Sequence, residues 1–131
     1  MFTKVLKRRW INLKQNKILS LVSMATKAGK TSSGEFMTEK EVKSGRAALV
    51  IVADDASDNT KKKFRDMCEF YEVPVYFYSD KDTLGHYMGK EFRASLAVTD
   101  EGFAKGIRKY FEQKIIFKLR VTGNMTKMRV H

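Results

Sequence analysis

Apolar residues near the start of the chain recur with the period of an amphipathic helix. Ile18, Leu21, Val22 and Ala25 follow the i, i+3, i+4, i+7 spacing that places side chains on one helix face. The pattern stops at Gly29, and a glycine at this place suits the left-handed conformation that ends many helices. The sequence therefore predicts a helix that ends just before residue 29.

Two further glycines bound a second predicted helix. A short polar stretch rich in β-branched residues, 30–33, is followed by Gly34, and the next helix is expected over roughly Glu35–Ser44. Gly45 follows directly and is expected to end it.

Three apolar runs predict strands. Leu49–Ala53 is unbroken, which is typical of a strand buried on both faces of a sheet. Further strands are expected at Val75–Tyr78, after the helix-breaking Pro74, and at Ala94–Thr99.

Helices are expected between and after these strands. A loop rich in capping residues, 54–59, precedes a helix with Phe64, Met67, Cys68 and Tyr71 on one face. A short helix is expected over Asp80–Met88. The last helix, capped by Asp100, has an apolar face that consists of Phe103, Ile107, Tyr110 and Phe111.

The alternation of strands and helices predicts an α/β domain with a mostly parallel sheet between helix layers. The complete set of periodic segments falls within residues 16–112, which we expect to form the domain. Residues 1–15 are expected to be a basic N-terminal extension and residues 113–131 a basic C-terminal extension. Within the latter, residues 114–122 are expected to form an extra strand or a helix turn.

Charge is distributed unevenly along this pattern. The chain has 26 basic and 15 acidic residues and a net charge of +11. Residues 1–30 carry eight basic residues and no acidic one, residues 31–100 have a net charge of −3, and residues 101–131 have a net charge of +6. A basic surface attracts polyanions by releasing counterions. Nucleic acid is the expected partner, an anionic membrane surface is the rarer one, and solubility alone is the alternative.

Few residue types in the chain point to other chemistry. Cys68 is the only cysteine and lies on an apolar helix face, so we expect it to pack in the core and the protein to be cytoplasmic. His86 and His131 are the only histidines, which argues against a zinc site. No phosphate-binding glycine loop of the G-x-x-x-x-G-K-[ST] type is present, and no cofactor or small-molecule substrate is expected. No apolar run has the roughly 20 residues of a membrane span, so no membrane partner is expected.

Asp54 and Asp55 follow a predicted strand, at the place where α/β proteins bind ligands. They suggest a magnesium or phospho-acceptor site, as in a regulatory module of response-regulator-like topology. We favour helix capping and loop solvation instead, because no partner lysine, base or third carboxylate with a recognisable motif accompanies them. For the same reason the chain is not expected to be an enzyme.

A series of short motifs, taken in order along the chain, carries a resemblance to a known family. The series consists of Thr26–Lys30, Gly34 at a helix start, Lys40, Arg46–Ala56, Val73–Val75, Leu84-Gly85, Gly89–Glu91 and Ala97–Phe103. Together they resemble the L-seven-Ae/L-thirty-e superfamily of ribosomal, kink-turn-binding RNA proteins, over residues 16–112. The chain looks most similar to the small bacterial branch described as ribosomal-protein-like.

The resemblance implies a three-layer α/β/α sandwich with a mixed, mostly parallel central sheet of about four strands. It also implies a site for structured RNA, such as ribosomal RNA or another kink-turn-like RNA, that joins three pieces of the chain. These are Gly34, Glu35, Phe36, Met37 and Lys40 at the second helix, Asp54 and Asp55 after the buried strand, and Glu91, Phe92, Arg93 and Ala94 before the last strand.

The chemistry of these residues agrees with such a site. A helix N-terminus suits phosphate or base-edge acceptors, and Lys30 and Lys40 can neutralise the phosphates of a kink. Phe92 with Arg93 offers an apolar and cationic surface for a flipped-out base. Archaeal members of this family have an Asn-Glu pair after the helix-opening glycine, which reads sheared G·A base pairs. This chain has Phe36 and Met37 at those places.

Overall fold

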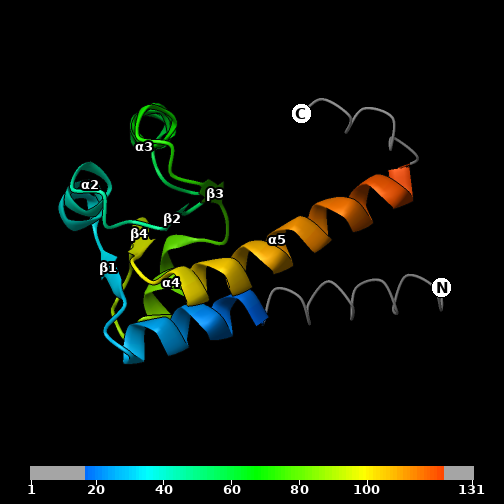
Figure 1. Cartoon of the computed structure of the whole chain (residues 1–131), viewed down its shortest axis with the longest axis horizontal. Coiled ribbons are helices and arrows are strands. Elements are labelled where there is room, and N and C mark those ends of the chain that lie inside the picture. The colour runs from blue at the N-terminus through cyan, green and yellow to red at the C-terminus, as the bar shows by residue number, and fades with distance from the viewer. Residues whose placement is uncertain (1–16, 123–131) are drawn as a thin grey trace.

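Strands and helices alternate along the part of the chain that the structure describes. The computed structural model describes the backbone of residues 17–122 and the side chains of residues 17–113 (Figure 1). After a first helix over residues 17–27, the elements are β1 (Thr31–Ser33), α2 (Glu35–Lys43), β2 (Leu49–Val52), α3 (Asp58–Phe70), β3 (Val75–Phe77), α4 (Lys81–Tyr87), β4 (Ser95–Val98) and α5 (Glu101–Thr122). Each helix and strand predicted from the apolar pattern within these residues is present.

Glycines end or begin several elements as predicted. Gly29 and Gly45 have φ values of +73° and +79°, in the left-handed region that follows a helix end. Gly34, with φ +90°, turns the chain from β1 into α2. The last helix is capped as expected, because the Asp100 carboxylate accepts a hydrogen bond of 3.0 Å from the Phe103 N–H.

The four strands form one mixed sheet in the order β1-β4-β2-β3. Only β2 and β3 are parallel; β4 runs antiparallel to both of its neighbours, β1 and β2. The predicted mixed sheet of four strands is confirmed, but the expectation that it is mostly parallel was wrong.

The reason for this difference lies in β4. A strand buried on both faces reads as an unbroken apolar run whatever its direction, so the pattern of Ser95–Val98 does not indicate which way it runs. The connection after β3 is short: α4 has seven residues, and β4 enters the sheet between β1 and β2 rather than beside β3.

Two apolar clusters, one on each face of the sheet, confirm the three layers of the sandwich. Ile51 and Leu96 pack with Ile18, Leu84 and Ile107, from the first helix, α4 and α5. On the other face, the cluster is formed by Val42, Val50, Val52, Ala56, Phe64, Cys68 and Ala97, which include residues of α2 and α3. Figure 1 shows α2 and α3 on one side of the strands and the first helix, α4 and α5 on the other.

The last helix is longer than the sequence pattern indicated. α5 runs without interruption from Glu101 to Thr122. Residues 114–122 therefore prolong this helix rather than form an extra strand. The predicted extension over residues 1–15 lies outside the described residues, as do residues 123–131 of the predicted C-terminal extension.

Candidate nucleic-acid interface

The sheet brings the three predicted pieces of the site to one of its ends. Val52, the last residue of β2, pairs with Ser95, the first residue of β4, and Ser33 at the end of β1 pairs with Leu96. The segments that follow β1 and β2 and the segment that precedes β4 must therefore meet at this end. We call this the sheet-end surface; it consists of Gly34, Glu35, Phe36, Met37, Lys40, Asp54, Asp55, Glu91, Phe92, Arg93 and Ala94.

Backbone hydrogen bonds hold the three pieces together. The Gly34 N–H donates to the Ser95 carbonyl at 3.0 Å, and the Ala53 N–H donates to the Ala94 carbonyl at 2.8 Å. A fourth piece, the loop after β3, joins them, since the Asp54 N–H donates to the Ser79 carbonyl at 2.7 Å. Ser79 has a φ of +65°, unusual for a residue other than glycine. This loop is not among the three pieces that the resemblance implies.

The first turns of α2 present apolar side chains to solvent. Phe36 is 77% exposed and Met37 is 40% exposed, while Thr38 beside them is buried and its hydroxyl accepts a hydrogen bond from Ser95. Lys40 is also exposed and lies on the same helix face, four residues after Phe36 and three after Met37. Among the described residues, no side chain caps the N-terminus of α2, so its first N–H groups are available to an acceptor.

The loop before β4 presents Phe92, 55% exposed, next to the well-anchored Arg93. The Arg93 N–H donates to the Lys81 carbonyl at 3.0 Å, its Nε donates to Ser33 Oγ at 2.9 Å, and one terminal nitrogen donates to the Phe92 carbonyl at 2.7 Å. Arg93 therefore fixes the loop against β1 and α4. The hydroxyl of Ser33, which the sequence analysis did not single out, is part of this arrangement.

Gly85 of α4 lets this loop approach closely. A Cβ atom at Gly85 would lie 2.5 Å from the Phe92 Cα and 2.8 Å from the Phe92 N. Only a residue without a side chain permits this contact between helix and loop backbone. This glycine thus sets the position of an exposed aromatic residue.

Asp54 and Asp55 are exposed and lie in the loop as predicted. Asp55 Oδ1 accepts a hydrogen bond of 2.9 Å from the Lys81 N–H, which ties the loop after β2 to the start of α4. Over the described part of the chain, no group of three or more histidine, cysteine, aspartate or glutamate side chains is arranged to hold a metal ion. The observed role of Asp55 is that of a loop-fixing acceptor.

Lys63 of α3 lies beside this surface, in a run of three lysines near the start of that helix. Lys63 Nζ lies 2.6 Å from a Glu39 carboxylate oxygen and 3.4 Å from a Glu35 oxygen, and so links α3 to α2. Hydrogen bonds from Lys43 and Lys63 lower the pKa of Glu39 to about 2. The negative charges of the Glu35 and Glu39 carboxylates, in the first half of α2, are thereby partly neutralised.

Lys30 is the one predicted site residue that the fold places elsewhere. Its carbonyl accepts a hydrogen bond of 2.9 Å from the Thr99 N–H, beyond the C-terminal end of β4. Lys30 and Gly34 therefore lie at opposite ends of β1. The expectation that Lys30 and Lys40 act together on the phosphates of one kink does not fit this geometry.

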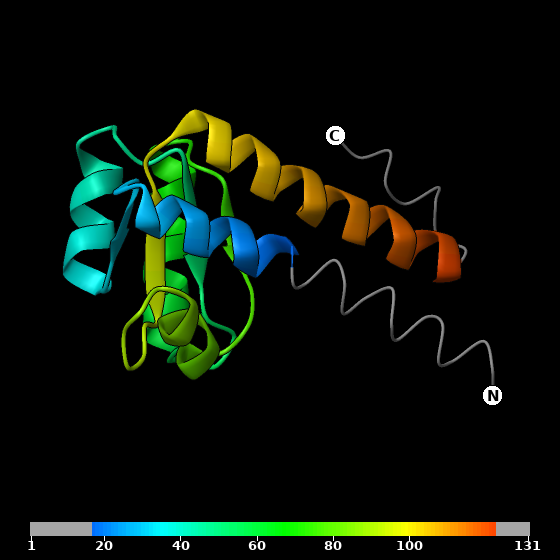
Figure 2. The ribbon, with the colours of Figure 1, turned by 90° about the horizontal axis from the view of Figure 1, so that it is seen from below.

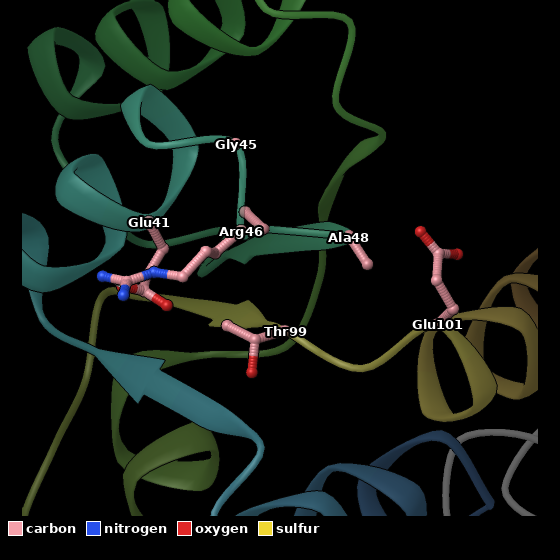
Figure 3. Close-up of a pocket in the computed structure, with 7 residues that line it drawn as sticks. Glu41, Gly45, Arg46, Ala48, Thr99 and Glu101 are labelled. Carbon is pink, nitrogen blue, oxygen red and sulfur yellow. The ribbon is translucent and has the colours of Figure 1, made fainter.

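A polar hollow occupies the same far end of the sheet as Lys30. Glu41, Gly45, Arg46, Ala47, Ala48, Thr99 and Glu101 line it (Figure 3). Arg46, a cation in the lining of this hollow, donates a hydrogen bond of 2.7 Å to the buried Glu41 carboxylate and is therefore already paired. This hollow is separate from the sheet-end surface.

Two further expectations concern the core and membranes. Cys68 is buried in the apolar cluster beneath α3, and burial raises the pKa of its thiol to about 11, as expected for a packing residue. Among the described helices, none has the length and apolar character needed to cross a membrane.

Comparisons with known proteins agree with this geometry. Residues 16–107 match the model of the Ribosomal protein L7Ae/L30e/S12e/Gadd45 family. The chain is 45% identical over 84 residues to RNA-binding protein YlxQ of Bacillus subtilis (strain 168), covering 64% of this chain and 84% of that protein. It is 36% identical over 98 residues to RNA-binding protein YlxQ of Enterococcus faecium, covering 75% and 94% of the two chains.

Solved structures show the same fold. A protein of unknown function from Bacillus halodurans C superposes with a TM-score of 0.71 at 35% identity, over 73% of this chain and 97% of that one. The Giardia lamblia 15.5kD RNA binding protein superposes with a TM-score of 0.66 at 22% identity, over 76% and 86%. The predicted resemblance is confirmed: the chain belongs to the Ribosomal protein L7Ae/L30e/S12e/Gadd45 family.

Proposed function

We propose that this protein binds structured RNA and that the sheet-end surface contacts a kinked or bulged part of it. The observation that carries the proposal is the pair of exposed aromatic side chains, Phe36 and Phe92, on two segments joined through Ser33, Gly34 and Ser95. Proteins recognise irregular RNA by stacking unpaired bases on aromatic or arginine side chains. Exposed phenylalanines held on a rigid frame suit this task.

The relatives support the same function. The two curated proteins that the chain matches at 45% and 36% identity are both named RNA-binding proteins. In the family that the chain resembles, the segments that correspond to these three pieces form the RNA site. Because they meet at one end of the sheet here, we carry that role over to this chain.

The substitution of Phe36 and Met37 for the archaeal Asn-Glu pair changes how the RNA is recognised. Neither side chain can read base edges by hydrogen bonds, so we expect recognition by stacking and by the shape of the RNA rather than by G·A pairs. The backbone N–H groups at the start of α2 and the Arg93 guanidinium supply the polar contacts.

We propose ribosomal RNA or another kink-turn-like RNA in the cytoplasm as the target, and an accessory role on the ribosome. The proposed activity is binding alone, without a catalytic step. Asp54 and Asp55 take part in it by shaping the loop beside α4 rather than as a phospho-acceptor.

The proposal is tested by titrating the full chain with two labelled RNAs. One is a duplex interrupted by a three-nucleotide bulge next to G·A pairs, and the other is the same duplex without interruption. We expect the interrupted RNA to bind at least tenfold more tightly, and Phe92→Ala to remove most of that preference. Equal affinity for the two RNAs in the unmodified protein would contradict the proposal.

A further inference from the structure

The positive charge of the chain is concentrated away from the sheet-end surface. That surface holds four carboxylates, Glu35, Asp54, Asp55 and Glu91, and two cations, Lys40 and Arg93. Residues 31–100, which supply all of it, carry a net charge of −3 in a chain of +11. The sheet-end surface therefore cannot provide most of the phosphate neutralisation that a basic RNA-binding protein offers.

A separate group of exposed cations lies on two helices that cover one face of the sheet, the first helix and α5. The first helix and α5 lie side by side in both views of the molecule (Figures 1 and 2). Lys17 Nζ lies 5.7 Å from the centre of the Tyr110 ring, and a Cβ at Gly106 would lie 3.3 Å from a Leu21 methyl carbon. The two helices thus pack closely against each other.

Five cations stand on this pair of helices. Lys17 and Lys27 are exposed on the first helix, and Lys105, Arg108 and Lys109 are exposed on α5. We call these five residues the helix-pair surface. Residues 17–30 contain no carboxylate, so nothing on the first helix opposes its charge.

The described cations of α5 are largely unpaired. Lys105, Arg108 and Lys109 line a shallow depression together with Glu112. Within the described side chains, the one ion pair that involves them is Arg108–Glu112, and its atoms are 3.9 Å apart. A pair this long and this exposed stabilises little, so the cations are available to an external anion.

We propose that the helix-pair surface is a second RNA-binding site, which holds the phosphate backbone of a regular helical segment independently of its sequence. The inference rests on the proposed function and extends it to a second face. Lys17 and Lys27 are ten residues apart, which is about 15 Å along a helix, so the cations extend over several phosphates of an RNA strand. The sheet-end surface selects the irregular element, and the helix-pair surface binds the helix that flanks it.

The test compares two variants that lose the same charge. Lys105→Gln/Lys109→Gln removes two cations from α5, and Lys61→Gln/Lys62→Gln removes two from α3 on the other side of the sheet. Each is titrated with the uninterrupted RNA duplex between 50 and 200 mM salt, with thermal unfolding as the control for folding. We expect the α5 variant to bind roughly tenfold more weakly at low salt, and its log–log salt slope to fall in magnitude by about 1.4–1.8, the value for two phosphate contacts.

The α3 variant is expected to keep the wild-type slope and to lose less than about threefold in affinity, because only the general attraction is reduced. Equal losses in both variants would mean that binding follows net charge, and would overturn the proposal. Tighter binding to vesicles containing anionic phospholipid than to the duplex, lost in the α5 variant, would assign this surface to a membrane and overturn it as well.

The two proposals can fail separately. If the interrupted RNA is preferred but the α5 variant binds both RNAs like the wild type, the helix-pair site is wrong and the sheet-end function stands. If neither RNA is preferred but the α5 variant loses duplex binding, the helix-pair site stands and the proposed selectivity fails.

Discussion

The sheet-end surface and the helix-pair surface are built in different ways. The sheet-end surface is assembled from three segments that are remote in the sequence, and the hydrogen bond that anchors Arg93 to Ser33, at the end of β1, joins residues 60 positions apart. The helix-pair surface uses cations that recur along two helices, such as Lys105, Arg108 and Lys109. The sheet-end surface holds a few side chains at defined positions, whereas the helix-pair surface distributes positive charge along two helices.

This difference fits the two tasks. Recognition of an irregular RNA shape requires aromatic and polar groups at defined positions, which tertiary contacts must hold. Neutralisation of a phosphate backbone depends on the number of cations and tolerates small shifts in their position. Substitutions that loosen the loops should therefore damage the sheet-end surface and leave the helix-pair surface intact.

The largest effect is expected from Gly85→Ala. The new Cβ would lie 2.5 Å from the Phe92 Cα, so the loop before β4 must move, and we expect the free energy of unfolding to fall by about 3 kcal/mol. Preference for the interrupted RNA should also decrease, while duplex affinity is kept. Chemical denaturation and the RNA titrations measure both effects.

Gly106→Ala is the matched control for that variant. It is also a glycine within a helix, but its Cβ would meet only the flexible end of Leu21, at 3.3 Å. Because alanine favours a helix, we expect unchanged or slightly higher stability, by up to about 1 kcal/mol. A similar loss of stability in the two variants would show that the close contact between Gly85 and the Phe92 backbone does not account for the effect of Gly85→Ala.

Phe92→Ala comes next. Removal of a stacking partner for one base is expected to weaken binding of the interrupted RNA by about 2 kcal/mol, without loss of thermal stability since Phe92 is 55% exposed. Phe70→Ala is the control, because Phe70 is 79% exposed at the end of α3, away from the sheet-end surface. An equal effect of both changes on RNA binding would contradict the assignment of Phe92.

Arg93→Ala and Lys40→Ala should each weaken binding of the interrupted RNA by roughly 1–2 kcal/mol, as for the loss of a charge-assisted contact. Only Arg93→Ala should also reduce stability, because Arg93 bonds Ser33 Oγ and the Phe92 carbonyl. Calorimetric titration with parallel thermal unfolding separates the two roles. If Lys40→Ala leaves affinity unchanged, the sheet-end surface does not extend along α2.

The smallest effect concerns Glu39. Its hydrogen bonds with Lys43 and Lys63 lower its pKa from 4.5 to about 2 in the folded protein, so its contribution to stability is present above pH 4.5 and is lost as the pH falls toward 2. Glu39→Gln should cost at most about 1 kcal/mol at neutral pH, given how exposed these pairs are. The difference in unfolding free energy between the two proteins should then vanish near pH 2. A Glu39 carboxyl that titrates near 4.5 by NMR would contradict the contacts.

The sequence by itself determined the helices and strands, the apolar residues that face the core and the uneven distribution of charge. Ile18, Val22 and Ala25 are buried as their spacing predicts, and Leu49–Val52 is a fully buried strand. These features depend on the local period of the backbone, which a sequence displays directly. The resemblance to a family added which three pieces form a site, with residue numbers.

Only the tertiary structure decided how the pieces lie relative to one another. Contacts between segments remote in the sequence set the direction of β4 and place Lys30 and Gly34 at opposite ends of β1. Such contacts also link Lys63 to α2 and anchor Arg93 to Ser33. A buried strand reads the same in either direction, and a lysine shows no partner until folding brings a carboxylate to it. Strand pairing and side-chain contacts between distant segments leave no periodic trace in a single sequence, and so the geometry of the sheet-end surface had to come from the fold.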